Sequence, residues 1–142
     1  NPYKTNEGPV VTFDLDEGCK PDYRGDCRRL PFGTGAYDIV HSRHLLEQFG
    51  PDETDDILTE MKRVLKPKGE LRLTVHSLNW VAEQVRTWSF SKGALKMLYG
   101  DGQKTAFTQV TLEKTLKEHG FSKVQFKLEG SEIHVAARSK RA

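Results

Sequence analysis

The sequence predicts an α/β layered fold built on a mostly parallel sheet, with an antiparallel strand at its C-terminal edge. Stretches rich in β-branched and aromatic residues alternate with stretches of helical periodicity along the chain, and this alternation is typical of parallel sheets covered by helices. Gly130-Ser131 lies between the last two strand-like stretches and suggests a hairpin-like turn, so we expect them to pair antiparallel. A length of 142 residues indicates one domain.

The N-terminal part of the chain holds three expected strands joined by loops. Val10–Phe13 is β-branched and aromatic and runs into the acidic Asp14-Leu15-Asp16, which indicates a strand followed by a loop. A brief strand is expected within Asp22–Asp26. Arg28–Gly35 contains one proline and two glycines and is expected to be a loop. The third strand is expected over Tyr37–Ser42.

A helix that begins at Gly50-Pro51 is the clearest prediction. Proline is preset for a first helical turn, and the two acidic residues that follow it suit the positive end of the helix dipole. Basic residues gather toward Lys66, and Pro67 is expected to stop the helix. The apolar residues recur at helical spacing and form one face: Ile57, Leu58, Met61, Val64 and Leu65.

The middle of the chain is expected to continue with a strand and two helices. Glu70–Val75 alternates polar and apolar residues and predicts a strand. Helices are expected around Trp80–Trp88 and Ser91–Tyr99, and Gly100-Asp101-Gly102 is expected to break the pattern.

The C-terminal part is expected to form a capped helix and two strands. Thr108 can cap a helix that carries Leu112 and Leu116 on one side. Gly120 is placed to be the left-handed residue after this helix, with Phe121 packing back on it. The two closing strands are expected over Lys123–Leu128 and Glu132–Ala137.

Composition argues against several classes of protein. Lys and Arg total 22 and Asp and Glu total 20, a difference of +2, which argues against a strongly basic nucleic-acid binder. A mean hydropathy of −0.64 argues against a membrane span, and no secretory leader is visible. Cys19 and Cys27 are too few, and wrongly spaced, for a disulfide framework or a zinc knuckle. We therefore expect reduced thiols, no metal site and a cytoplasmic location.

Three of the expected strands end in polar residues that can contact a ligand. In open parallel sheets, ligands bind at the carboxyl ends of the strands. Asp14 and Asp16 follow the first strand, Asp26-Cys27 follows the second, and Ser42-Arg43-His44 follows the third. One carboxylate can accept hydrogen bonds from a ribose diol, and another can accept one from the exocyclic amine of adenine. This set of residues therefore suits an adenosine-containing cofactor. Each aspartate taken alone is also typical of an ordinary turn.

Three segments resemble class I S-adenosylmethionine-dependent methyltransferases. Asp26–Phe49, DCRRLPFGTGAYDIVHSRHLLEQF, is similar to the family's D-x-x-x-L-P-F followed by a strand that ends near x-x-x-L-E-H. Glu60–Val75, EMKRVLKPKGELRLTV, resembles the R-V-L-K-P-G-G segment and the strand after it. Thr105–Phe121 resembles F-T-x-x-x-L-x-x-L-x-x-x-G-F. The resemblance implies a Rossmann-like sheet with helices on both faces, and S-adenosylmethionine as the cofactor.

The resemblance also implies roles for the residues after the first two strands. Asp14 or Asp16 would hold the ribose hydroxyls, and Asp14 is favoured because it is nearer to the strand. Asp26 would accept a hydrogen bond from the adenine amine, while the Cys27 N–H donates to the ring. Arg28 would flank the adenine.

The residues after the third strand stand where the family places groups around the transferred methyl. By resemblance, Ser42 and Arg43 would lie near the cofactor, and His44 would lie near the acceptor. His44 is our candidate catalytic base, because its ordinary pKa is close to working pH, although a purely structural histidine fits the same position. Glu47 is expected to orient His44 or to cap the chain locally, and His76 to lie at the same edge.

The chain departs from the family pattern most clearly at its start. The family's Gly-rich loop, G-C-G-P, and the strand before it are not in the sequence, and Asn1-Pro2-Tyr3 resembles the stretch that follows that loop. We expect residues 1–142 to be a single methyltransferase-like domain truncated at its N-terminus, and the non-Met start favours this. The alternative is a degenerate relative that folds without the strand, as a homodimer or a strand-swapped assembly.

The expected acceptor is a small molecule, with a sugar-like compound as one candidate. Residues 78–108 are expected to form an insert that covers it, and their aromatic residues suit such a pocket, although they would equally pack the insert onto the core. The Asn/Asp-Pro-Pro-aromatic motif of amino-base methylation is absent from the sequence, which argues against nucleic acid. The alternative function is a catalytically inactive binding or scaffold protein of the same fold.

Overall fold

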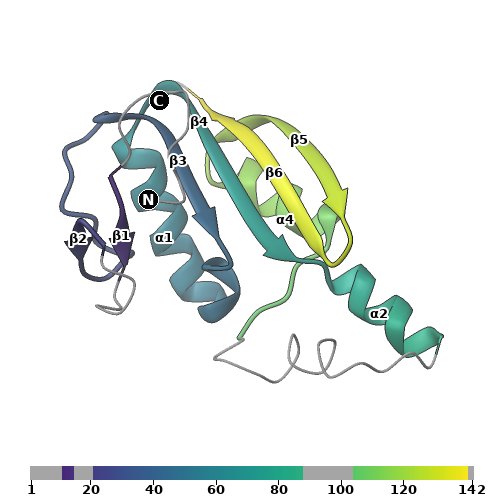
Figure 1. Ribbon diagram of the computed structural model, residues 1–142. Helices are drawn as coiled ribbons and strands as arrows, with labels where there is room; N and C mark the ends of the chain where they lie inside the picture. The colour runs from purple at the N-terminus through teal and green to yellow at the C-terminus, as the bar shows by residue number, and fades with distance from the viewer. Residues whose placement is uncertain (1–10, 15–20, 88–103, 141–142) are drawn as a thin grey trace.

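The computed structural model describes residues 11–14, 21–87 and 104–140 (Figure 1). Its main sheet has four strands in the order β3-β4-β6-β5, and a second sheet has two strands, β1 and β2. The strands are β1 (Phe13–Asp14), β2 (Tyr23–Arg24), β3 (Tyr37–Arg43), β4 (Leu65–His76), β5 (Phe121–Glu129) and β6 (Glu132–Ser139). The helices are the short 3-10 helix η2 (Leu46–Gln48), α1 (Pro51–Val64), α2 (Leu78–Arg86) and α4 (Gln109–Glu118).

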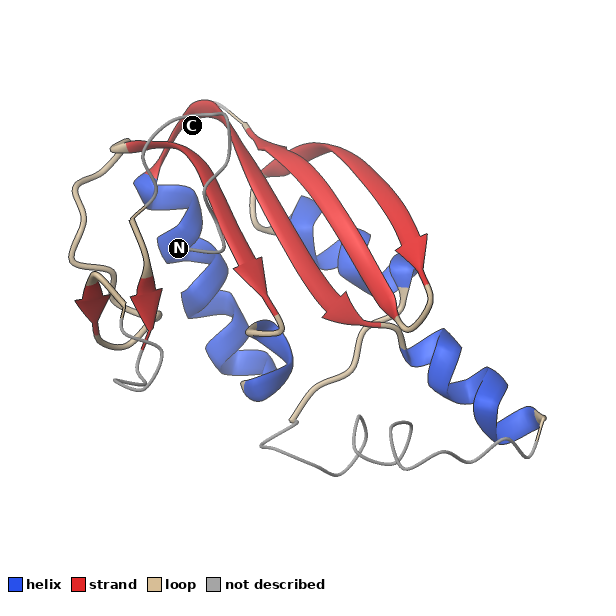
Figure 2. Cartoon of the chain, in the orientation of Figure 1, coloured by secondary structure: helices blue, strands red, loops and turns tan. Residues whose placement is uncertain are grey.

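The α/β fold class is confirmed, but the pairing in the main sheet differs from the prediction. β3 and β4 are parallel, whereas β6 is antiparallel to both β4 and β5, so most of the pairings are antiparallel although β3, β4 and β5 point the same way (Figure 2). The C-terminal strand is also not at the edge, because β6 lies between β4 and β5. The turn at Gly130, with φ of 59°, fixes β5 as one partner of β6 and leaves the other side of β6 for β4.

One face of the main sheet carries the apolar core. Leu71, Leu73 and Val75 alternate along β4, are at most 1% exposed, and form one cluster with the buried side chains of α1 and α4. Both helices therefore pack on the same face, behind the sheet in Figure 1. The resemblance implies helices on both faces. In the described part of the chain, the opposite face carries polar side chains such as Arg72 and His134 and is covered by neither helix.

The predicted helix after Gly50 is confirmed, but it ends earlier than expected. α1 begins at Pro51 and ends at Val64, and Leu65 is already extended. Proline disfavours the helical conformation of the residue before it, so Pro67 prevents Lys66 from continuing the helix. β4 then contains extra residues near Lys68, because its pairing with β3 shifts register between Leu65 and Glu70.

The C-terminal predictions agree closely with the structure. Thr108 caps α4 by accepting a hydrogen bond from Thr111 N–H at 3.1 Å, and Leu112 and Leu116 are fully buried. Gly120 adopts a left-handed conformation with φ of 85°, and Phe121 is buried in the core.

The helix expected around Trp80–Trp88 corresponds to α2, which begins earlier because the Ser77 side chain caps it. The helix expected over Ser91–Tyr99 lies outside the described residues. No helix in the described part of the chain is long and apolar enough to cross a membrane.

Aromatic rings connect the two-stranded sheet to β3, and one arginine of α1 holds the loop after it. Phe32 makes edge-to-face contacts with Phe13, Tyr23 and Tyr37 at centroid distances of 6.0, 5.2 and 5.2 Å. Arg63 of α1 donates hydrogen bonds to the carbonyl oxygens of Leu30 and Phe32, at 3.0 and 2.9 Å. These contacts fix the loop after β2 against the helix that follows β3.

Candidate active site

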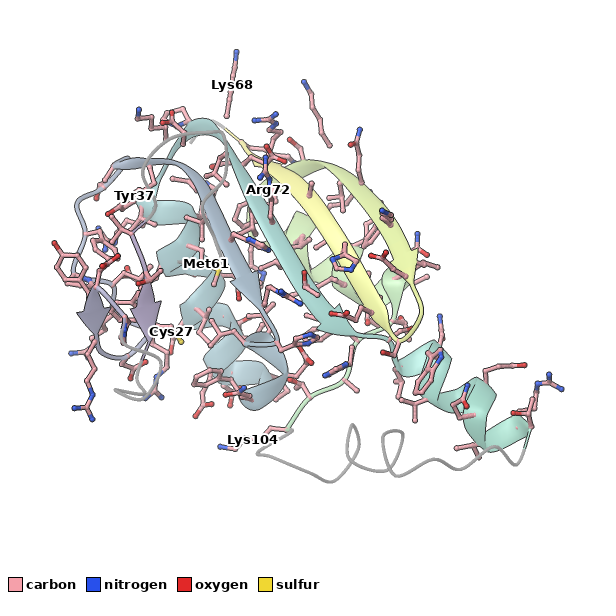
Figure 3. The ribbon with its side chains drawn as sticks, viewed as in Figure 1. Cys27, Tyr37, Met61, Lys68, Arg72 and Lys104 are labelled. Atoms are coloured by element: carbon pink, nitrogen blue, oxygen red, sulfur yellow. The ribbon has the colours of Figure 1, made fainter. Side chains whose placement is uncertain are left out.

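The strands β3 and β4 end at the same edge of the main sheet, because they are parallel. β3 ends at Arg43 and β4 ends at His76. Lys104 lies at this edge, where its N–H donates to the Glu47 carbonyl at 2.7 Å, and Lys68 lies at the opposite end of the molecule (Figure 3). Polar residues after the strands therefore gather on one side, as a strand-end site requires.

His44 directly follows β3, and its imidazole ring stacks on that of His76. Its φ of 50° is left-handed, a conformation that costs a non-glycine residue on the order of 1–3 kcal/mol. Its N–H donates to the Thr74 carbonyl at 2.8 Å, which holds the turn against β4. The imidazole rings of His44 and His76 are stacked, with centroids 4.2 Å apart and planes 23° apart. Two strand ends thus bring two imidazoles to one place.

Glu47 is a buried carboxylate next to this pair. Its side chain is 1% exposed, and its Oε2 lies 3.5 Å from His44 Nδ1 and 3.7 Å from His76 Nε2. Oε2 also accepts from the His76 backbone N–H at 3.2 Å, while Oε1 has no hydrogen-bond partner. Burial raises the pKa of Glu47, although the His76 N–H and the nearby His44 oppose that rise.

Glu132 completes the group from the start of β6. The antiparallel register places Glu132 opposite His76, and its Oε2 lies 2.8 Å from His44 Nε2. With Glu132 ionised, this contact assigns the ring proton of neutral His44 to Nε2. Burial lowers the pKa of His76, and His44 adds to this effect, whereas Glu132 opposes it. The four side chains form what we call the His–Glu cluster: His44, Glu47, His76 and Glu132.

Asp26 forms a second polar site, after β2. Its Oδ1 accepts from the Arg28 N–H at 2.9 Å, and its Oδ2 accepts from Arg28 Nη2 at 2.6 Å. These hydrogen bonds lower the pKa of Asp26 to about 2, so the group stays an ionised acceptor. Its side chain is 41% exposed. An ionised carboxylate with this exposure fits the adenine-amine acceptor that the resemblance implies.

The Asp26 site and the His–Glu cluster flank the same short stretch of chain. Arg28 Nη1 lies 3.6 Å from Glu53 Oε1 in the first turn of α1. Glu53 Oε2 in turn accepts from the Gly50 N–H at 3.2 Å, and Gly50 follows η2, which carries Glu47. Contacts through Glu53 therefore link the segment that carries Asp26 to the segment that carries Glu47.

The remaining predicted residues differ in how they are placed. Ser42 is buried and Arg43 is exposed, as neighbours on a strand are, so their side chains lie on opposite faces of the sheet. Cys27 is half-buried and packs against the core, next to α1 in Figure 3. The side chain of Asp14 and all of Asp16 lie outside the described residues.

The sequence did not predict the part that Glu132 plays. Glu132 is 88 residues from His44, and only the register of the β5–β6 hairpin brings the two together. The sequence nevertheless contains a signal for this contact, because Glu132 follows the hairpin turn and His76 ends β4. An antiparallel pairing of those strands places both residues at the same edge.

The fold class is the one that the resemblance implied. Residues 8–73 match the family model described as a methyltransferase domain. An uncharacterized methyltransferase of Synechocystis sp. is 39% identical over 46 residues, which cover 32% of this chain and 22% of that protein. These findings confirm the resemblance to class I S-adenosylmethionine-dependent methyltransferases and support S-adenosylmethionine as the cofactor.

Solved structures of methyltransferases share the fold at low sequence identity. Human N-acetylserotonin methyltransferase in complex with SAM is similar with a TM-score of 0.67 and 20% identity, over 91% of this chain and 40% of that chain. A SAM-dependent methyltransferase from Methanosarcina mazei gives a TM-score of 0.62 and 20% identity, over 86% of this chain and 69% of that chain. The chain spans less than half the length of the human enzyme and about a fifth of the Synechocystis protein.

Proposed function

We propose that the protein is an S-adenosylmethionine-dependent methyltransferase that acts on a small-molecule acceptor, with a sugar-like compound as one candidate. The observation that carries the proposal is the family match over residues 8–73, because that span includes every residue to which the sequence assigns cofactor contact. The aromatic residues among 78–108 support a small acceptor, and we propose that this segment covers it.

The proposed cofactor contacts lie after β1, β2 and β3. Asp26 accepts from the adenine amine, the Cys27 N–H donates to the ring, and Arg28 flanks it. Asp14 or Asp16 holds the ribose hydroxyls. Support comes from the low pKa and the partial exposure of the Asp26 carboxylate, since an ionised and partly exposed carboxylate is a strong acceptor that a ligand amine can reach.

The proposed reaction is an in-line displacement at the methyl carbon. The cofactor supplies the electrophile: its sulfur–methyl bond breaks, the electron pair goes to sulfur, and the acceptor atom forms the new bond to carbon. The chain's task is to align the acceptor and to take up its proton if it carries one. We assign the proton to His44 Nδ1, because Nε2 of that ring faces Glu132 at 2.8 Å.

We also propose that the protein is cytoplasmic and that it associates with a second copy of itself. On the side away from β4, β3 has no paired strand among the described residues. An open edge of this kind can pair with another strand, which supports a homodimer or a strand-swapped assembly.

Calorimetric titration of the protein with S-adenosylmethionine tests the cofactor site. Asp26→Ala is expected to weaken binding on the order of 10- to 100-fold, the range for a lost hydrogen bond to a charged group. Asp38→Ala is the matched control, because Asp38 is exposed and pairs with Lys66 at the start of β3, and it should leave the affinity unchanged. Equal affinities in the two variants would contradict the site.

A further inference from the structure

Three residues of the His–Glu cluster have the composition and spacing of a metal site. One potential ligand atom each from His44, Glu47 and His76 lies within 4.8 Å of the others. Imidazole nitrogens and a carboxylate oxygen form one of the usual ligand sets of Zn²⁺. We infer that these three side chains bind one divalent transition-metal ion, with Zn²⁺ as the expected occupant.

The buried carboxylate of Glu47 is the strongest indication of a missing cation. The side chain is 1% exposed, and its Oε1 has no hydrogen-bond partner. Among the described residues, the hydrogen bond to Oε2 comes from the backbone N–H of His76. A buried carboxylate with so few donors is costly unless a charge compensates it. A bound ion would supply that charge.

The contact between His44 and Glu132 prepares the ring to be a ligand. Because Nε2 faces the Glu132 carboxylate at 2.8 Å, a neutral His44 presents the lone pair of Nδ1 toward Glu47. Nδ1 is buried and has no hydrogen-bond partner. Histidine ligands of metals usually donate their other N–H to a carboxylate or a carbonyl, which fixes the tautomer and the ring orientation. Glu132 is placed to do this for His44.

The separations between the ligand atoms are close to those of a bound ion. Glu47 Oε2 lies 3.5 Å from His44 Nδ1 and 3.7 Å from His76 Nε2. Tetrahedral zinc, with bonds of about 2.0–2.1 Å, holds its ligand atoms about 3.3 Å apart. Without a proton or a cation between them, the lone pairs of these atoms repel one another. All three pairs of atoms lie within 4.8 Å, and the two stacked rings have to turn toward Glu47 for the three lone pairs to meet at one ion.

Three protein ligands leave a fourth position for water or for another oxygen or sulfur. Three ligands with one open position are typical of catalytic zinc sites. We place the acceptor's reacting atom at that position, which rests on the proposed function. A metal there lowers the pKa of the group it binds, so His44 would then act as a ligand and not as the base.

A metal titration of the chelator-treated protein tests the site without cofactor or acceptor. Zn²⁺ is measured by competition with a chromophoric indicator, and Co²⁺ by its visible absorption. We expect one ion per chain, with loss of stoichiometric binding in His44→Ala and in His76→Ala. Glu132→Gln should weaken binding about 10- to 100-fold, as other losses of a partner to a histidine ligand do. His119→Gln is the control, because His119 pairs with Asp55 outside the cluster.

The outcomes of the metal titration test this site independently of the proposed methyl transfer. Stoichiometric binding that is lost in the cluster variants and kept in His119→Gln supports the site, whether or not the protein transfers methyl groups. Absence of stoichiometric Zn²⁺ and Co²⁺ binding in the wild-type protein overturns it, as does unchanged binding in both His44→Ala and His76→Ala. Thermal unfolding of each variant confirms that lost binding is not lost folding.

Discussion

The main sheet and the two-stranded sheet are held together by different forces. In the main sheet, β4 is paired on both sides, and its apolar residues form one buried cluster with α1 and α4. β1 and β2 pair over only two residues each, and the loop after them is fixed by the ring of Phe32 and by hydrogen bonds from Arg63. One region is thus stabilised by buried apolar area, and the other by a few surface contacts.

This difference implies two levels of stability in one chain. Segments with few buried apolar contacts open at lower free energy than the core does. The Asp26 site belongs to the weakly held region, whereas the His–Glu cluster lies at the strand ends of the main sheet and on the short helix η2. We therefore expect a ligand at the proposed Asp26 site to stabilise a weakly held segment, and a ligand at the cluster to contact groups of the better packed region.

The largest expected effect is a truncation in the core. Leu116→Ala removes a side chain that is 0% exposed in α4 and should destabilise the protein by about 2–5 kcal/mol. Leu128→Ala makes the same change on β5 at a side chain that is 62% exposed, with an expected cost under about 0.5 kcal/mol. Urea unfolding measures both. Similar costs for the two variants would show that buried apolar area does not stabilise the main sheet.

A smaller, local effect is expected at the two-stranded sheet. Phe32→Leu keeps apolar volume but removes three edge-to-face ring contacts, each of which contributes about 0.5–1.5 kcal/mol in favourable cases. Hydrogen exchange should become faster at the Tyr23 N–H, which donates to the Thr12 carbonyl, and stay the same at Leu73 in β4. If both amides accelerate equally, the two regions unfold as one unit.

The smallest expected effect concerns the pH dependence of stability at the cluster. Burial lowers the pKa of His76 below 6.5, so the unfolded chain takes up this proton at a higher pH than the folded chain does. Stability should therefore fall as pH falls from about 6.5 toward the folded pKa. Burial also lowers the pKa of His41, so His76→Gln should reduce this slope but leave the part that His41 contributes. Each proton accounts for at most about 1.4 kcal/mol per pH unit.

Urea unfolding at a series of pH values measures that slope. Leu128→Ala is the control, because it changes no titratable group and should keep the wild-type slope. A wild-type slope in His76→Gln would show that another group causes the acid sensitivity.

Local features of the fold were predictable because they depend on short stretches of sequence. Pro51 and the apolar spacing after it defined α1, and Thr108 with Gly120 defined the two ends of α4. The position of β6 in the strand order of the main sheet was not predictable in this way. Its alternating pattern determines which face is buried, but strand order depends on which neighbour is available for its second edge.

The candidate site was predictable only in part, for the same reason. Asp26, His44 and His76 were recognisable because they follow strands. Glu132 was missed because its contact with His44 depends on the register of strands far apart in the sequence. The burial of Glu47 was also hidden, since its position in η2 does not reveal that the His76 N–H and the rings close over it.

The position of β6 inside the sheet has a consequence for how the chain acquires its structure. β5 joins the sheet only through β6, and the β4–β6 ladder pairs Glu70 with Arg138. β4 and β5 both precede β6 in the sequence, so β5 can join the main sheet only once β6 pairs with β4. Pairing over such a sequence separation is slow, and we expect β6 to control the step that completes this sheet.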